Sequence, residues 1–286
     1  MDVAASDRRI ARGTGGGSAP SAARELVHST WVIARRGIAH MRRQPEALAD
    51  ATIQPIMFTI LFAYVFGGAI KVAGGSYREF LIGGIFAQTL TFGIFGTAMA
   101  LAADRQNGAV DRFRSLPIPR GALLSGHAVA SLIRSALPIL LMSVSGLIVG
   151  WRIHSSIGEA IAGYALMFAF AFAIIWLGVL LAASVGTPEA VQGIAFIAIF
   201  PITFVASTFV PVRTLPEPLE TFAQWNPVST VADSLRKLFG NPGAHPGPNS
   251  PWPMHHPIEY SLIWIVAIVL ICAPISARMY QRSISN

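Results

Sequence analysis

The charged residues of this chain concentrate in one short stretch between two apolar segments. Asp, Glu, Lys and Arg make up only 12% of the 286 residues, yet residues 104–120 contain two aspartates and four arginines. Asp104 can cap a helix, and Pro117 would end it. Because Val110 and Phe113 recur at helical spacing among the charges, the stretch predicts a short amphipathic helix that binds a soluble partner. The alternative is a solvated loop whose arginines only fix membrane topology.

The patterns that carry bond-making chemistry are missing from the sequence. A phosphate-binding loop of the form G-x-x-x-x-G-K-[ST] does not occur, and the only lysines, Lys71 and Lys237, fall in or near segments expected outside the cell. His255 and His256 are adjacent and cannot share one helical face as a zinc pair does. The serines near Gly146 lack the G-x-S-x-G pattern and a supporting Asp or His. The sequence therefore predicts no catalytic centre, no metal site and no cofactor site in this chain.

Composition places the chain in a membrane. Apolar residues make up 53% of the sequence and the mean hydropathy is +0.56, which exceeds what a soluble core of this size needs. The sequence predicts an all-α integral membrane protein in which residues 51–286 form one domain of six transmembrane helices. The expected spans are residues 53–70, 80–103, 123–150, 157–185, 190–210 and 258–277. Pro138 is expected to kink the third span, and Pro201 to break the fifth.

The basic balance of the chain follows this topology. The net charge is +7, and the arginines lie beside apolar segments instead of forming a groove with interleaved aromatics, so nucleic acid is not an expected partner. The two chain ends and residues 104–126 carry fourteen Lys and Arg, the opposite side carries six, and Arg134 is unassigned. Because Lys and Arg accumulate on the cytoplasmic side, we expect both termini and the charged stretch in the cytoplasm.

Three further segments differ in composition from the spans. Residues 1–22 are rich in Gly, Ser and Arg, which is typical of a disordered cytoplasmic tail. Residues 23–50 mix apolar and basic side chains, which predicts an interfacial helix in the cytoplasmic headgroup layer, with Pro45 ending it. Residues 211–257 are proline-rich, and we expect two short external helices there, on either side of Asn226, that lie on the outer leaflet or dip into it in a re-entrant manner.

Five residues within the expected spans are candidates for a substrate pathway. They are Gln88, Arg134, Phe168, Phe172 and Trp176. An arginine at the centre of a membrane helix costs roughly 2.5 to 3.5 kcal/mol on insertion scales, so Arg134 should snorkel, find a partner or face an aqueous cavity. The alternative places Arg134 near the cytoplasmic edge of a helix that starts late. The aromatic residues of the fourth span could line a route for an apolar substrate, and packing against lipid explains them equally well.

The arrangement resembles the membrane subunits of type-2 ABC exporters, especially the daunorubicin-resistance-like branch. The likeness covers most of the chain, from the interfacial helix through six spans to the external segment between spans five and six. Its most specific motif is formed by Asp104, Gly108, Asp111, Arg112, Phe113, Arg114, Leu116, Pro117 and Arg120. A second match is formed by Asn226, Pro227, Asp233, Leu235 and Arg236. The first acidic position, often glutamate in the family, is Asp104 here, which keeps the charge and shortens the reach.

The resemblance implies a permease that pairs with itself or with a sibling, as a homodimer or heterodimer, and binds two separate ATPase subunits. Those subunits, and no site in this chain, would hold ATP and Mg²⁺. Residues 104–120 would contain a coupling helix seated on the ATPase, with docking contacts from Asp111, Arg112 and Phe113. The full coupling set is Asp104, Arg105, Gly108, Asp111, Arg112, Phe113, Arg114, Leu116 and Pro117. The implied cargo is an amphiphilic drug or lipid-like molecule moving outward across the plasma membrane.

Two other functions stay open on the sequence alone. A secondary transporter or channel would be driven by an ion or proton gradient, and would be expected to carry acids deep in its spans and inverted repeats. A membrane-embedded lipid-modifying enzyme would need a polar catalytic cluster near an interface, for which only the region of His245, His255 and His256 qualifies.

Overall fold

The computed structural model describes residues 45–106, 122–185, 187–243, 246–248 and 250–285, and every regular element in these ranges is a helix. The elements are α2 (Pro45–Val65), α3 (Tyr77–Gln106), α5 (Ala122–Val149), α6 (Ile157–Ser184), α7 (Pro188–Phe204), the 3-10 turn η1 (Val212–Thr214), α8 (Glu217–Trp225), α9 (Pro227–Phe239), α10 (Trp252–His255) and α11 (Pro257–Ser285). The all-α class expected from the sequence is confirmed for the described residues.

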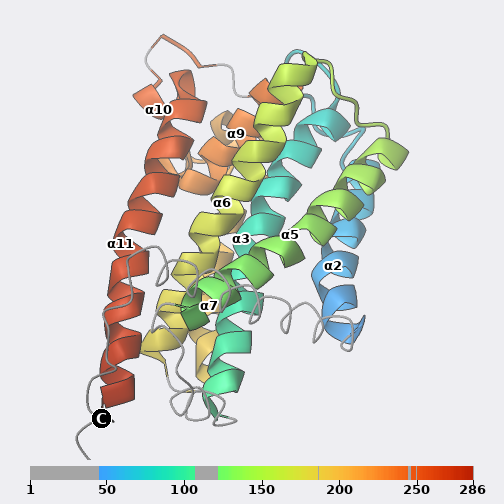
Figure 1. The fold of residues 1–286 in the computed structure, drawn as a ribbon. Helices are drawn as coiled ribbons and strands as arrows, with labels where there is room; N and C mark the ends of the chain where they lie inside the picture. The colour runs from blue at the N-terminus through green and yellow to red at the C-terminus, as the bar shows by residue number, and fades with distance from the viewer. Residues whose placement is uncertain (1–44, 107–121, 186, 244–245, 249, 286) are drawn as a thin grey trace, which may run out of the picture.

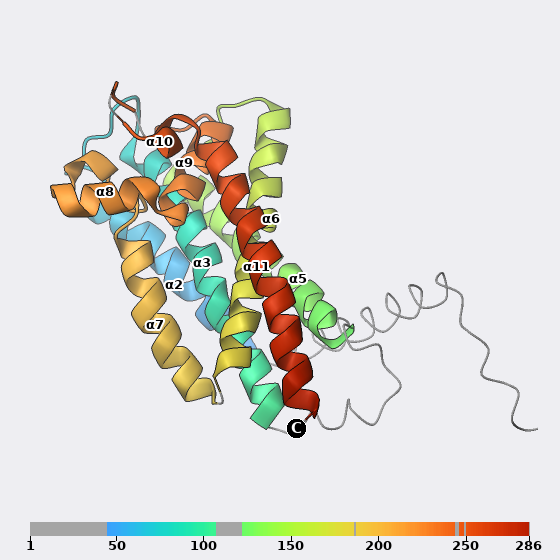
Figure 2. The same ribbon diagram turned by 90° about the vertical axis from the view of Figure 1, so that its left-hand side faces the viewer.

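Helix α3 lies at the centre of a bundle (Figure 1). The long helices α2, α3, α6, α7 and α11 run roughly along one direction, and α5 crosses them obliquely. Helix α3 packs against α2, α5, α6, α7 and α9. The helices α8, α9 and α10 gather at one end of the bundle, which we call the short-helix end, and α8 lies across the long helices there (Figure 2). The end of α3, the start of α5, the turn between α6 and α7 and the end of α11 lie at the other end, the insert end.

Four of the helices are long and apolar enough to cross a membrane. These candidate spans are Tyr77–Asp104, Ala128–Val149, Ile157–Ser184 and Pro257–Met279. Two shorter apolar helices, Ile53–Val65 and Pro188–Phe204, occupy the places of the first and fifth expected spans. Large apolar side chains such as Leu270 and Ile148 are exposed on the long helices, as a lipid environment requires. The chain is therefore a membrane protein with four helices of spanning length among its described residues.

The first and fifth apolar helices end earlier than the sequence predicts. Helix α2 ends at Val65, five residues before the expected boundary at residue 70, and the chain turns at residues 66–69. Helix α7 ends at Phe204, because the side-chain amide of Asn226 satisfies carbonyls of its last turn and leaves no need for a further turn. Pro201 does not break α7, since a proline removes only its own N–H and the Pro201 carbonyl still accepts from Val205 N–H.

Pro45 begins a helix instead of ending one. It occupies the first position of α2, where a proline costs little because its missing N–H would have no partner within the helix. Pro55 lies inside α2, and Thr59 Oγ1 donates to the Pro55 carbonyl at 2.8 Å. Residues 45–50 of the expected interfacial helix are thus the start of α2. Residues 1–44, with the expected tail and the rest of that helix, lie outside the described residues.

Helix α6 starts where the sequence predicts because its first turn carries a complete cap. The Ser156 side chain accepts from Glu159 N–H at 3.3 Å, and the Glu159 carboxylate accepts from Ser156 N–H at 2.9 Å. This reciprocal pair satisfies two N–H groups that have no partner within the helix. At the start of α7, Thr187 forms a one-way cap, in which its hydroxyl oxygen accepts from Ala190 N–H.

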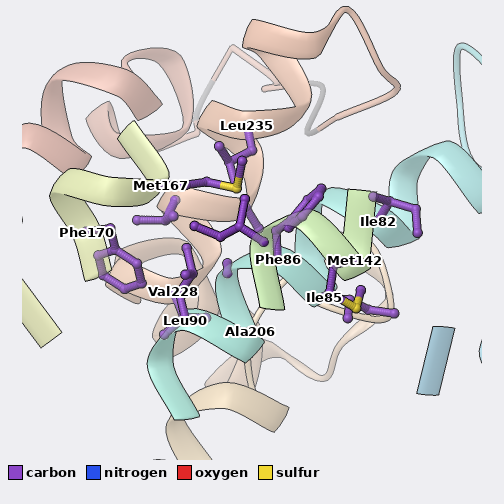
Figure 3. Packing of buried hydrophobic residues seen from close by; sticks show 14 of the residues in the cluster. Ile82, Ile85, Phe86, Leu90, Met142, Met167, Phe170, Ala206, Val228 and Leu235 are labelled. Atoms are coloured by element: carbon purple, nitrogen blue, oxygen red, sulfur yellow. The ribbon is translucent and has the colours of Figure 1, made fainter. Parts of the chain in front are cut away.

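The core fills the space between α3, α6, α5 and α9 (Figure 3). Ile85, Phe86 and Leu90 of α3 meet Met167 and Phe170 of α6, while Val228 and Leu235 reach the same cluster from α9. Ring contacts continue the cluster toward the short-helix end, where Phe239 packs edge-on against Trp151 at 5.4 Å between centroids. In lipid such close packing, rather than escape from water, holds helices together.

Candidate functional site

The structure fixes both ends of the expected coupling segment. Helix α3 ends at Gln106 and α5 begins at Ala122, so the segment between them is joined directly to two long helices. Asp104 is half-buried in the last turn of α3, and Arg105 follows it in the same turn. The other coupling residues lie outside the described residues, namely Gly108, Asp111, Arg112, Phe113, Arg114, Leu116 and Pro117, and so does Arg120 of the same motif. Whatever binds this segment has a direct connection to the centre of the bundle through α3.

Three of the five pathway candidates carry a buried N–H group that has no hydrogen-bond partner among the described residues. These groups are Nε2 of Gln88, Nε of Arg134 and Nε1 of Trp176, on α3, α5 and α6 respectively. A fourth such atom is the hydroxyl oxygen of Ser276 on α11. Unpaired buried donors are costly, particularly in lipid, so a group with hydrogen-bond acceptors would be stabilised beside them.

Arg134 lies well inside helix α5. Helix α5 starts at Ala122, twelve residues before Arg134, so the helix itself does not start late. At about 1.5 Å per residue, Arg134 is about 18 Å from the start of the helix, and its depth in the membrane stays a prediction. Its Nη1 atom lies 3.9 Å from the position that a Cβ at Gly96 would take, so the guanidinium faces an exposed glycine of α3.

The five pathway candidates do not form one cluster. The rings of Phe172 and Trp176 meet at 6.2 Å between centroids and pack against a small apolar cluster of α3, α5, α6 and α7. Phe168 packs against the larger core, and Gln88 is 2% exposed on α3, two turns from Gly96. The candidates are therefore spread along the inner faces of three neighbouring helices.

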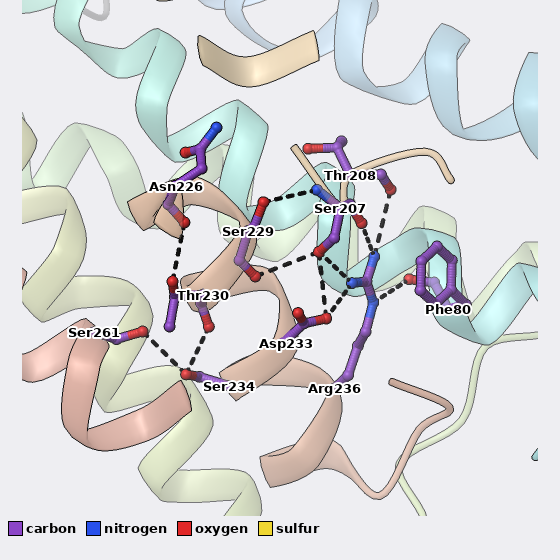
Figure 4. Close-up of polar contacts among 10 residues, drawn as sticks. All are labelled: Phe80, Ser207, Thr208, Asn226, Ser229, Thr230, Asp233, Ser234, Arg236 and Ser261. Carbon is purple, nitrogen blue, oxygen red and sulfur yellow. Dashed lines mark hydrogen bonds and ion pairs between the residues drawn. The ribbon is translucent and has the colours of Figure 1, made fainter. Parts of the chain in front are cut away.

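The densest polar site of the described residues lies at the short-helix end, around Arg236 of α9 (Figure 4). The Arg236 side chain is fully buried, and all of its nitrogen atoms donate. Nε donates to the Phe80 carbonyl at 2.8 Å, and Nη1 to Asp233 Oδ1 at 2.6 Å and Ser207 Oγ at 2.9 Å. Nη2 donates to the carbonyls of Ser207 and Thr208. One guanidinium thus connects α9 to the first turn of α3 and to residues 205–211.

Burial dominates the electrostatics of Arg236. Desolvation lowers the pKa of the guanidinium, and the Asp233 carboxylate one helical turn away acts in the opposite direction. The guanidinium carbon also lies 3.5 Å from the centroid of the Phe80 ring, a cation–π geometry that favours the charged form. A buried charge with this many charge-assisted bonds is stabilised where it lies and would be costly to release.

Asn226 and a chain of hydroxyls extend this network to α7 and α11. The Asn226 amide donates to the carbonyls of Ile202 and Val205, and its Oδ1 caps α9 by accepting from Val228 N–H at 2.9 Å. The Thr230 hydroxyl donates to the Asn226 carbonyl, the Ser234 hydroxyl donates to the Thr230 carbonyl, and Ser261 of α11 meets Ser234 at 3.0 Å (Figure 4).

The resemblance drew attention to Asn226, Asp233 and Arg236, but not to their partners. Phe80, Ser207 and Thr208 contribute mostly backbone carbonyls, which carry no side-chain signal in a sequence. The one available signal was the Gly83–Gly84 pair, because a Cβ at Gly84 would collide with the Thr208 backbone and one at Gly83 would lie 2.7 Å from Arg236 Cγ.

The histidines of the alternative enzyme interpretation lie near α10. His256 stacks on Trp252 with ring centroids 5.2 Å apart, and its Nδ1 is 3.7 Å from Glu259 Oε1. His255 ends α10, and His245 lies outside the described residues. Over the described ranges no group of three or more His, Cys, Asp or Glu side chains is placed to hold a metal ion.

Comparison with known proteins places these features in context. Residues 28–239 match the ABC-2 type transporter family. The chain is 26% identical over 249 residues to a daunorubicin resistance ABC transporter permease of Streptomyces coeruleorubidus, covering 86% of this chain and 84% of the relative. It is 23% identical over 265 residues to a protein named as a probable doxorubicin resistance ABC transporter permease of Mycobacterium tuberculosis, covering 92% of each. It is also similar to a transport permease of Porphyra purpurea, at 25% identity over 76% of each chain.

Proposed function

Because the chain belongs to the ABC-2 type transporter family, we propose that it is the membrane-spanning permease subunit of an exporter powered by a separate ATP-binding-cassette ATPase. The match spans most of the chain and includes both the charged stretch and α9, which is the observation that carries the proposal. ATP and Mg²⁺ are held by the partner subunit. The cargo is an amphiphilic drug or lipid-like molecule moved outward across the plasma membrane, in line with the drug-resistance names of two relatives.

Residues 104–120 dock this permease on the ATPase. The direct attachment of the segment to α3 and α5 supports this role, because a coupling element must be tied to the helices it moves. Asp111, Arg112 and Phe113 make the docking contacts, while Asp104 and Arg105, in the last turn of α3, lie at the membrane edge. The assembly contains two permease chains, as a homodimer or a heterodimer, and two ATPase subunits.

The chain crosses the membrane six times with both termini in the cytoplasm. Helices α2 and α7 supply the first and fifth crossings in addition to the four long spans. The insert end, which carries the turn between α6 and α7 and the end of α11, is cytoplasmic, and the excess of Lys and Arg in the segments leading to it supports this orientation. Residues 1–22 are a cytoplasmic tail, and residues 23–50 lie in the cytoplasmic headgroup layer and continue into α2, which begins at Pro45.

The short-helix end faces the outside at the level of the outer headgroups. Trp225 of α8, Trp252 of α10 and Trp264 of α11 each pack edge-on against Tyr260, with centroid distances of 6.1, 6.0 and 6.2 Å. Tryptophan and tyrosine are enriched where a membrane meets water, so this group supports placing the first turn of α11 at that boundary. Leu219 and Phe222 are exposed on α8 and rest in the outer leaflet.

The cargo passes along the inner faces of α3, α5 and α6, where it meets the unpaired N–H groups of Gln88, Arg134 and Trp176, with Phe168 and Phe172 contributing apolar surface. Replacing Arg134 by glutamine removes a charge-assisted donor, which is worth about 1.5 to 3 kcal/mol when satisfied. We expect the concentration of stimulating compound needed for half-maximal ATP hydrolysis to rise roughly tenfold or more.

The matched control is Arg152→Gln, which removes an exposed arginine of the same charge that bonds only to local backbone carbonyls. In this variant, the compound should stimulate ATP hydrolysis with the same half-maximal concentration as in the unmodified protein. If the half-maximal concentration is the same for the two variants, Arg134 does not contact the cargo.

The proposed function is tested by purifying the permease in mild detergent with a co-expressed ATP-binding-cassette ATPase. We expect a stable complex, hydrolysis stimulated by one or more amphiphilic compounds, and ATP-dependent accumulation of that compound in vesicles. Accumulation driven by an ion gradient in the absence of any ATPase would instead identify a secondary transporter. Chemical conversion of a lipid by the purified chain would identify an enzyme.

A further inference from the structure

The geometry around Arg236 points to a positioning role in transport. We propose that Arg236 joins α9 to α3 permanently, so that α9 follows every movement of α3. This inference rests on the proposed function, because it concerns how a push at the insert end reaches the opposite end of the bundle. The role is distinct from cargo binding, since the guanidinium is fully buried and its N–H groups are already occupied.

We call the contact of Arg236 with Phe80 of α3 and with residues 207 and 208 the α3–α9 joint. The packing around this joint leaves no space for α9 to slide along α3. Gly84 of α3 meets the Thr208 backbone so closely that a Cβ would collide with it, and Gly83 leaves room only for the Arg236 stem and the Ala232 carbonyl. Tyr77, in the first turn of α3, donates its hydroxyl to the Phe209 carbonyl at 2.9 Å. Helix α3, residues 205–211 and α9 are therefore interlocked by backbone contacts, which cannot relax by rotating a side chain.

The bonds that hold α9 to its neighbours are unequal. Separating α9 from both α3 and residues 205–211 would strand the buried guanidinium together with the carbonyls of Phe80, Ser207 and Thr208, which is among the costliest changes inside a protein. Between α9 and α11 the described residues form one neutral hydrogen bond, Ser234 with Ser261, and a charge interaction of Lys237 with the exposed Glu259 carboxylate. If any contact of α9 yields when the bundle changes shape, the joint with α3 is the last to do so.

Helix α3 can carry a displacement from one end of the bundle to the other. It has 30 residues and no proline, and at a rise of about 1.5 Å per residue it is about 45 Å long. Its last turn leads into the proposed coupling segment, and its first turn holds Arg236. Docking and release of the ATPase at one end thereby reposition α9 at the other.

The joint can be replaced by a covalent one. Ser207 N–H donates to Ser229 Oγ at 2.9 Å, so cysteines at 207 and 229 are close enough to link α9 to the segment locked against α3. The native Cys272 is first replaced by serine, which leaves only the introduced pair. ATP-dependent transport and ATP hydrolysis are then measured on the same vesicles with the pair oxidised and reduced, in complex with the ATPase.

In the Arg236→Gln background with the pair reduced, we expect transport to fall roughly tenfold or more, the size of a lost coupling between distant sites, while ATP hydrolysis stays within about twofold. Oxidation should restore most of the transport, because the disulfide holds α9 on the same segment. The double-cysteine protein that retains Arg236 has lost the Ser207 hydroxyl as an acceptor of Nη1 in both states, so its reduced state is the reference, and oxidation should leave its transport unchanged. If Arg236 were needed only for folding, oxidation of protein that is already in the membrane would not restore transport.

Three results would overturn the proposal: unchanged transport in Arg236→Gln, no recovery on oxidation, or loss of transport when the link forms in the presence of Arg236. The last would mean that the joint opens in each cycle. Lys237→Gln, an exposed neighbour on the same helix, is the control and should behave as the unmodified protein. If Arg236→Gln fails to reach the membrane, Arg236→Lys keeps the charge and removes the fork that binds several carbonyls. Failure of the unmodified chain to bind or stimulate the ATPase would contradict the proposed function instead.

Discussion

Replacement of Phe113 by aspartate is expected to abolish ATP-dependent transport while the chain still inserts in the membrane. Phe113 is the largest apolar side chain of the amphipathic stretch, and an aromatic anchor in a docking site typically contributes about 2 to 4 kcal/mol. Its loss, with an added buried charge, should weaken binding of the ATPase on the order of a hundredfold. The measurement is co-purification of the two subunits together with cargo-stimulated hydrolysis.

The control for this variant is Ser115→Asp, which adds the same charge to the same stretch at a position outside the docking set. We expect nearly normal co-purification and transport from it. If Phe113→Asp retains cargo-stimulated hydrolysis at the unmodified level, residues 104–120 are not the coupling element, even if the chain remains a permease.

Replacement of Gly84 by alanine should destabilise the folded chain more than any other single methyl addition among the glycines of α3. The new Cβ would overlap the backbone carbonyl of Thr208, and a backbone atom cannot move aside as the end of a side chain can. Overpacking of this kind costs about 1 to 3 kcal/mol or more, which corresponds to a decrease of several degrees, on the order of 10 °C, in the midpoint of thermal unfolding. Retention of the folded species on size-exclusion chromatography after heating measures it.

Gly93 offers a matched control on the same helix. A Cβ at Gly93 would have no heavy atom within 4 Å, so Gly93→Ala should be neutral or slightly stabilising. Equal thermal stability of the two variants would mean that α3 and residues 205–211 are not packed as described.

The long helices were predictable because hydropathy alone marks them. The spans expected at 157–185 and 80–103 agree with α6 and α3 to within three residues at each end, since nothing but continuous apolar sequence is needed for such helices. The ends of α2 and α7 were not predictable from hydropathy. The end of α7 depends on a partner far along the chain, Asn226, which donates to carbonyls there.

The candidate sites were predictable only in part, for a similar reason. Charge density points to residues 104–120, of which only 104–106 are described, so their coupling role stays a prediction, while Arg134 is half-buried within α5. The contacts of Arg236 could not be predicted from the sequence because most of its partners are backbone carbonyls, and only the resemblance marked Arg236 and Asp233. A sequence shows which side chains are available but not which carbonyls a fold leaves for them.

The position of Asn226 makes two helices depend on one residue. One side chain both completes α7, by donating to the carbonyls of Ile202 and Val205, and initiates α9, by accepting from Val228 N–H. The end of α7 and the start of α9 are therefore linked through one side chain. A change that unwinds the last turn of α7 would deprive the residue that caps α9 of its carbonyl partners.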